Sequence, residues 1–295
     1  MKTILFLFLF LSMPLLAIAQ DDFSKVEIKA TKVNGNVYML QGSGGNIGVS
    51  VGTDGILIVD DQFAPLADKI KATLKTLGEG KLKFILNTHW HGDHTGGNAQ
   101  FGRDAPIIAH DNVRKRLSTE QRLEFFKETV PAAPKEALPV ITFDQSLSVH
   151  FNGEEIRVIH FPHGHTDGDS IIFFTTSNVV HMGDDFFAGR FPFVDLDSGG
   201  SVQGLTKNIG EIIPKVPAGA KLIPGHGPIS TIDDLKAYHR MLIETTEIVR
   251  KKIAAKKNLD QIKKEGLPAE WKSWGEGFIK TDQWIEIVFA SLSKK

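Results

Sequence analysis

Four metal-binding side chains lie within six consecutive residues of this chain: His89, His91, Asp93 and His94. They follow an apolar run, residues 84–86, that predicts a buried strand, and nearby glycines let the backbone turn tightly after it. In such a turn His89 and His91 can face one point, while Asp93 and His94 face a second point beside it. Imidazole nitrogen and carboxylate oxygen suit borderline cations such as zinc. The motif therefore predicts a metal site, because a solvated polar loop does not need three imidazoles and a carboxylate together.

Three later segments also place metal-binding side chains at the ends of apolar runs: residues 162–169, 181–185 and 224–227. Together with the first motif, they indicate that distant segments converge at one edge of a sheet. The chain has no cysteine, so every ligand must be a nitrogen or oxygen atom. The candidates in these segments are His163, His165, His181, Asp184, Asp185 and His226.

Alternating strands and helices must position these segments. Strands are expected at 26–30, 37–40, 46–51, 55–61, 106–109, 147–151, 156–161, 170–175, 179–182 and 221–223. Helices are expected from about 65 to 78, over 112–129 and 202–213, after a capping box at 230–233, and over 284–292. Strands and then helices in two similar halves predict an α+β fold, in which two sheets pack together with helices outside.

Composition is ordinary for a globular protein: 41% of the 295 residues are hydrophobic. No clear linker divides the halves, so residues 20–295 are expected to form a single domain with a C-terminal helical extension. The formal net charge of −1 shows no excess of basic residues of the kind that binds nucleic acid. We therefore expect a small-molecule substrate and no nucleic-acid partner. The sequence makes no prediction of oligomeric state.

The N-terminus predicts export. Lys2 precedes an apolar run over residues 4–16, and a small-x-small site, residues 17–19, follows it. This pattern is typical of a signal peptide, residues 1–19, with cleavage before Gln20. The apolar run is short for a membrane-spanning helix, so no stable membrane anchor is expected after cleavage. The mature protein is therefore expected in the periplasm or secreted.

The form and order of these motifs resemble those of the metallo-β-lactamase superfamily, over most of the chain from about Val37 to the helix after His226. The resemblance implies an αβ/βα four-layer sandwich with the metals at one edge. It implies two zinc ions per chain and a carboxylate, Asp184, that bridges them. The implied ligands of the first ion are His89, His91 and His165, and those of the second ion are Asp93, His94 and His226.

The resemblance also chooses between neighbouring residues. His165 is preferred to His163 because the family's ligand directly precedes Thr in a Gly-His-Thr turn. Asp184 is preferred to Asp185 because the family's ligand directly follows Gly. The residues not chosen, together with His181, are then expected to support the ligands or to lie at the surface.

Such a site implies metal-assisted hydrolysis, in which a hydroxide held between the two zinc ions attacks an amide, ester or lactone bond. Asp93 would orient this hydroxide and help to carry its proton, and Asp60 resembles the acid that orients a metal-binding histidine. A β-lactam is one candidate substrate. However, the β-lactamases most like this layout have Cys where Asp184 stands and Lys where Phe187 stands.

The loop over residues 186–195 contains four phenylalanines and one arginine. With Trp90 it would form an apolar wall near the metals, and the arginine would pair with a substrate carboxylate. The same aromatic residues would also suit ordinary packing. The expected substrate contacts are Trp90, Phe187, Arg190 and Phe191. The alternative to an enzyme is a non-enzymatic metal- or partner-binding protein on the same fold, which a missing ligand would favour; none is missing.

Overall fold

The computed structural model describes residues 22–294. The predicted signal peptide and its cleavage site lie outside the described residues. Among the helices within residues 22–294, none has both the length and the apolar character needed to cross a bilayer.

The first sheet has seven strands in the order β1-β2-β3-β4-β5-β6-β9. Neighbours from β1 to β4 are antiparallel, and neighbours from β4 to β9 are parallel. The carboxyl ends of β4, β5 and β6 therefore lie at the same edge. The strands are β1 Lys29–Asn34, β2 Val37–Gln41, β3 Ile47–Gly52, β4 Gly55–Val59, β5 Leu82–Leu86, β6 Ile107–His110 and β9 Ile141–Phe143.

The second sheet has five strands in the order β10-β11-β12-β13-β14. Its neighbours are antiparallel except for the parallel pair β13 and β14, whose carboxyl ends therefore lie together. The strands are β10 Ser146–Phe151, β11 Glu154–His160, β12 Ser170–Phe174, β13 Val179–His181 and β14 Lys221–Ile223.

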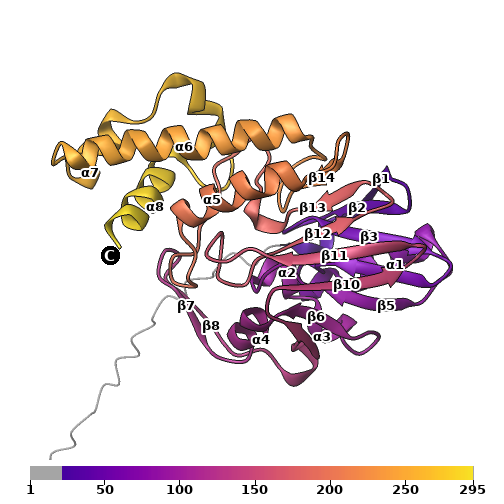
Figure 1. Ribbon diagram of the computed structural model, residues 1–295. Helices are drawn as coiled ribbons and strands as arrows, with labels where there is room; N and C mark the ends of the chain where they lie inside the picture. The colour runs from indigo at the N-terminus through magenta and orange to yellow at the C-terminus, as the bar shows by residue number, and fades with distance from the viewer. Residues whose placement is uncertain (1–21, 295) are drawn as a thin grey trace, which may run out of the picture.

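Apolar side chains of both sheets pack against each other, and helices cover the two outer faces. Met39 and Leu57 of the first sheet share a core with Val158 and Phe174 of the second. Helix α1 (Ala67–Leu77) packs on the outer face of the first sheet. The second sheet is covered by α5 (Val202–Ile212), α6 (Ile232–Ala254) and α8 (Thr281–Ser293), which gather on one side in Figure 1. The predicted sandwich with outer helices is confirmed.

Shorter elements connect these layers. The helices are α2 Gly92–Thr95, α3 Asn98–Phe101, α4 Asp111–Leu117 and α7 Leu259–Glu265, and the strands are β7 Gln121–Leu123 and β8 Glu128–Val130. The 3-10 turns are η1 Phe23–Lys25, η2 Ala64–Leu66, η3 Lys135–Ala137, η4 Gly183–Asp185, η5 Ile213–Lys215 and η6 Ala269–Glu276.

The structure contradicts the prediction of one helix over 112–129. Helix α4 ends at Leu117, and β7 and β8 form a separate antiparallel hairpin. Lys127 turns the chain with a left-handed φ of 54°. Tertiary contacts explain the difference, because Phe125 and Phe126 of the hairpin both pack on the ring of Phe193.

Two boundaries also shift. The first strand begins at Lys29 rather than at residue 26. The capping box of α6 pairs Thr231 with Asp234, one residue later than predicted. Asp234 reaches back to accept a hydrogen bond from the Thr231 backbone N–H at 2.8 Å.

Candidate metal centre

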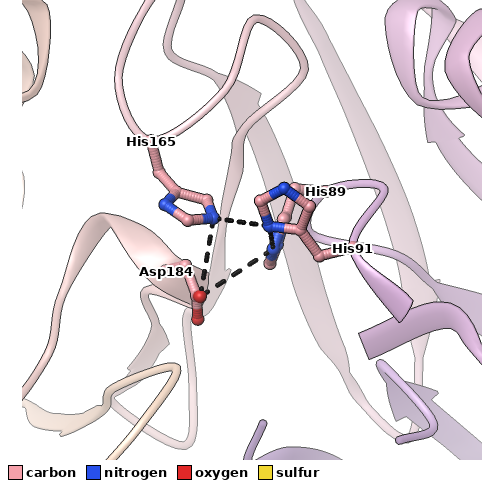
Figure 2. Close-up of side chains that lie close together, drawn as sticks. All are labelled: His89, His91, His165 and Asp184. Atoms are coloured by element: carbon pink, nitrogen blue, oxygen red, sulfur yellow. Dashed lines mark hydrogen bonds and ion pairs between the residues drawn. The ribbon is translucent and has the colours of Figure 1, made fainter. Parts of the chain in front are cut away.

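The predicted ligands lie on loops that leave the carboxyl ends of four strands. His89 and its three neighbours in the motif follow β5, and His165 follows β11. Asp184 follows β13, and His226 follows β14. The loops converge at one edge of the sandwich, as the sequence predicts. Figure 2 shows His89, His91, His165 and Asp184 pointing toward one another from the segments that follow β5, β11 and β13.

The first group comprises His89, His91, His165 and Asp184, all of them buried. His91 Nδ1 lies 3.1 Å from His89 Nε2 and 2.8 Å from His165 Nε2. A tetrahedral zinc ion with its usual nitrogen distances separates two ligand nitrogens by about 3.3 Å. The three nitrogens are therefore spaced much as a single zinc ion requires.

Hydrogen bonds on the outer side of two rings fix which nitrogen carries the proton. His165 Nδ1 lies 2.8 Å from the Phe193 carbonyl oxygen, which can only accept. The Thr88 hydroxyl donates to Asp60 at 2.8 Å, so it accepts from His89 Nδ1 at 3.0 Å. Both rings therefore carry their proton on Nδ1 and turn the Nε2 lone pair inward.

His91 is oriented by Asp195, whose role the sequence did not predict. His91 Nε2 donates to Asp195 Oδ2 at 2.9 Å, which leaves the Nδ1 lone pair facing the other two histidines. Burial raises the pKa of Asp195, but the bond from His91 and that from Ser198 hold it at about 2. A carboxylate within an apolar, aromatic stretch was the only signal in the sequence for this residue.

The three inward lone pairs fit a cation. Burial and the nearby positive charge of His94 keep the pKa of His89 well below its ordinary value, and burial also lowers that of His165. Both rings are therefore neutral near neutral pH. Neutral nitrogens that face one another without a shared proton repel, and a metal ion held by these three residues would relieve this repulsion.

The second group comprises Asp93, His94 and His226. Asp93 Oδ2 lies 3.2 Å from His226 Nε2 and 3.6 Å from His94 Nε2. Behind His94, the Asp60 carboxylate accepts a hydrogen bond from Nδ1 at 2.7 Å. Asp60 thus occupies the orienting position that the sequence analysis expected for it.

Asp184 faces both groups. Its Oδ1 lies 3.0 Å from His94 Nε2 and 3.4 Å from His226 Nε2. Its Oδ2 lies 3.5 Å from His165 Nε2 and 3.9 Å from His89 Nε2. In the described part of the chain, His94 Nε2 and Asp184 Oδ1 are buried without a hydrogen-bond partner. Because a metal ion would satisfy both atoms, the donor set fits a bridged pair of ions.

Protonation differs between the two groups. Burial would lower the pKa of His226, but the Asp184 and Asp93 carboxylates raise it to about 9. The same two carboxylates, with Asp60, raise the pKa of His94 well above its ordinary value against the effect of burial. Burial would raise the pKa of Asp93, but His94 and His226 hold it at about 2. Without metal, the second group therefore holds protons in place of the ion.

Two glycines leave room for the ligands. A Cβ atom added at Gly225 would lie 2.0 Å from Asp184 Oδ1, and one at Gly45 would lie 2.1 Å from His94 Cε1. These distances are far below van der Waals contact. The close approach of backbone to ligand at both positions therefore requires glycine.

The neighbours that the sequence analysis set aside lie outside both groups. His163 is exposed and donates to the Gly199 carbonyl oxygen at 3.0 Å. His181 is buried and donates to the Asn46 carbonyl oxygen at 3.1 Å. Asp185 accepts a hydrogen bond from the His165 backbone N–H at 3.2 Å, so it supports a ligand loop.

A pocket of about 580 Å³ opens over the two groups. Four of the seven predicted ligands reach it: His91, Asp93, Asp184 and His226. All four predicted substrate contacts also line it: Trp90, Phe187, Arg190 and Phe191. A water molecule and a substrate can therefore reach the ligand groups from one side.

Comparison with known proteins agrees with this geometry. Residues 30–257 match the family model described as the metallo-beta-lactamase superfamily. The chain is 22% identical to a metallo-beta-lactamase type 2 of Bacteroides fragilis, over 83% of this chain and 99% of that one. It is 28% identical to an atrochrysone carboxyl ACP thioesterase of Aspergillus terreus, over 60% of this chain and 48% of that one.

A solved structure shares the fold. A metallo-beta-lactamase from Pontibacter korlensis superposes with a TM-score of 0.60 at 16% identity, covering 74% of this chain and all of the other. This likeness and the family match confirm the predicted αβ/βα sandwich. The chain belongs to the metallo-β-lactamase superfamily, whose members are mostly hydrolytic metalloenzymes.

Proposed function

We propose that this protein is an exported hydrolase that binds two zinc ions and cleaves an amide, ester or lactone bond in a small molecule. The observation that carries the proposal is the position of Asp184, whose two oxygens face two adjacent ligand groups beneath an open pocket. Zinc suits a donor set of five imidazoles and two carboxylates without sulfur. When bound, two zinc ions would polarise the substrate carbonyl and lower the pKa of a water molecule toward neutrality.

Different residues would hold the metal ions and orient the attacking water. His89, His91 and His165 are held by outward hydrogen bonds and would keep one ion in a fixed place. Asp93 lines the pocket and has a side chain 27% exposed, against 5% for Asp184. We therefore assign to Asp93 the task of orienting the attacking water and taking part in its proton transfer.

The names of two relatives support an acyl bond as the target. A β-lactamase hydrolyses a cyclic amide, and a thioesterase hydrolyses a thioester. Both reactions pass through attack of water on a carbonyl carbon. A β-lactam remains one candidate, and the screen described next includes it.

The test begins with the purified mature protein. We expect about two zinc ions per chain by elemental mass spectrometry, and hydrolysis of at least one of nitrocefin, a lactone or an aryl ester. A chelator should abolish the activity and added zinc should restore it. Activity that survives complete metal removal would contradict the proposal. Mass spectrometry of the protein from a periplasmic fraction should give an N-terminus at Gln20.

A matched pair of variants tests the role of Asp93. Asp93→Asn should lower kcat by about 100-fold or more, since it removes a group that handles a proton. Asp104→Asn, which changes a carboxylate that pairs with Lys71 away from the pocket, should leave kcat unchanged. Unchanged kcat in Asp93→Asn would remove Asp93 from the mechanism.

A further inference from the structure

One wall of the pocket comes from residues that the family model does not cover. The match ends at residue 257, but Phe278 and Ile279 line the pocket. Both follow η6 in the C-terminal segment. We refer to residues 269–279 as the C-terminal wall. This part of the pocket therefore lies outside the region that the family model matches.

The C-terminal wall is attached firmly to the loop that follows Asp184. The Phe191 backbone N–H donates to the Trp274 carbonyl oxygen at 3.0 Å. The ring of Phe191 stacks on that of Trp284 with centroids 5.6 Å apart and planes 10° apart. A Cβ atom at Gly277 would lie 3.0 Å from Arg190 Cβ and 3.3 Å from Arg190 Cδ, so the aliphatic stem of Arg190 rests on the wall. The wall therefore sets the position of Arg190.

The hairpin of β7 and β8 adjoins the C-terminal wall at the rim of the pocket. The ring of Phe126 lies 4.7 Å from that of Phe193 and 5.7 Å from that of Phe278, centroid to centroid. Leu123 and Val130 of the same hairpin also line the pocket. Phe278 is 71% exposed, which is unusual for a phenylalanine. The hairpin and the C-terminal wall thus form one continuous apolar surface at the rim of the pocket.

Arg190 is the one lysine or arginine among the described residues that line this pocket, which also has His91 and His226 in its lining. It is half-buried, and it forms no ion pair or hydrogen bond with any other residue in 22–294. Of the three carboxylates that line the pocket, Asp93 and Asp184 face the histidines, and Glu128 is exposed at the start of β8. A guanidinium in apolar surroundings without an acidic partner favours an anion supplied by the ligand.

We propose that the C-terminal wall and the hairpin select substrates that combine a bulky apolar group with an anionic group. The apolar group would lie against the adjoining rings of Phe126 and Phe278, and the anion would pair with Arg190. The inference rests on the proposed function only for the position of the bond that is cleaved.

The experiment measures binding of stable probes to the zinc-loaded protein by calorimetry. The probes are 4-phenylbutyrate, the uncharged 4-phenylbutan-1-ol, and acetate, which lacks the apolar group. We expect 4-phenylbutyrate to bind at least about tenfold more tightly than either of the other two, as one charge-assisted hydrogen-bonded pair provides.

Variants separate the two parts of the recognition. Arg190→Gln should reduce binding of 4-phenylbutyrate to the level of the alcohol, and Arg190→Lys should restore part of it. Phe278→Ala should weaken the carboxylate and the alcohol alike. Arg157→Gln, on the exposed face of β11, is the control and should change nothing. Thermal unfolding of each variant checks that the fold is kept.

Two outcomes would overturn the inference. One is undiminished binding of 4-phenylbutyrate to Arg190→Gln, which would mean that the carboxylate binds the metals directly. The other is acetate binding as tightly as 4-phenylbutyrate. Failure of the proposed function gives a different pattern, in which the probes bind selectively while no ester, amide or lactone is hydrolysed.

Discussion

The Asp195 carboxylate accepts a hydrogen bond from His91 Nε2 at 2.9 Å, although 104 residues separate the two in the chain. Asp195 is itself held by the backbone N–H groups of Asp197 and Ser198, at 3.1 Å and 3.0 Å. This support fixes both the tautomer and the direction of the His91 ring. The ring orientation that brings three nitrogens together therefore depends on a residue that is not a ligand.

Asp195→Ala should lower the affinity of the first group for zinc by about 10- to 100-fold, because His91 loses its orienting partner. Asp195→Asn should lose less zinc affinity, since the amide oxygen can still accept the hydrogen bond from His91 Nε2. Competition with a chromogenic chelator measures both affinities. Asp197→Ala, which removes a more exposed neighbouring carboxylate, is the control. An unaltered affinity in Asp195→Ala would show that the ring holds its place without help.

Gly225→Ala should displace Asp184, because the added methyl group would overlap its Oδ1 atom. We expect fewer than two zinc ions per chain and a loss of about 1–3 kcal/mol in the free energy of unfolding. Gly92→Ala lies in the same metal-binding region with no atom within 4 Å of the added Cβ. That variant should keep its zinc and its stability. Equal behaviour of the two variants would contradict the close contact at Gly225.

Zinc binding to the second group should release protons. The pKa of His226 is raised to about 9 and that of His94 is also raised, so both rings are charged near neutral pH. A charged imidazole must lose its proton before it can bind a metal. Affinity of this group for zinc should therefore rise with pH from neutrality to at least about pH 9, where His226 loses its proton.

The first group should release fewer protons than the second when it binds zinc. The lowered pKa values of His89 and His165 mean that these rings bind zinc near neutral pH without releasing a proton. Calorimetry in two buffers with different ionisation enthalpies counts the protons for each binding step. Equal proton release in the two steps would contradict the assignment of charges.

Metal removal should destabilise the fold. Zinc that binds only the folded chain adds about 4 kcal/mol to the free energy of unfolding at a free concentration 1,000 times its Kd. Urea unfolding with and without chelator measures this difference. His165→Ala, which lacks one buried ligand, should show a smaller difference. No effect of the chelator on the parent protein would mean that the metal contributes nothing to its stability.

The ligand groups could be predicted from the sequence because each ligand lies in the segment that follows an apolar strand. Parallel strands end at the same edge of a sheet, so strand order alone brings together the loops after β4 and β5, and likewise those after β13 and β14. The choice of His165 over His163 depended on the resemblance. In the structure His163 instead faces solvent, with a left-handed φ of 55°.

The hairpin of β7 and β8 could not be predicted in this way. Its residues have no glycine or proline at the turn, and their charge pattern resembles that of a helix. Contacts of Phe125 and Phe126 with Phe193, far along the chain, override this local preference. Asp195 was missed for the same reason, because its partner is distant in sequence. The hairpin and the role of Asp195 both depend on contacts between distant parts of the chain, which local sequence patterns do not reveal.

Each ligand group draws on both sheets. The first combines His89 and His91, which follow a strand of the first sheet, with His165 from the second. The second combines Asp93 and His94 with His226 in the same way. A bound ion would thus act as a cross-link between the two layers, much as a disulfide would in a protein that has cysteine. Because this chain has no cysteine, bound metal ions would be its means of cross-linking the two sheets. Either half expressed alone would offer only an incomplete set of ligands.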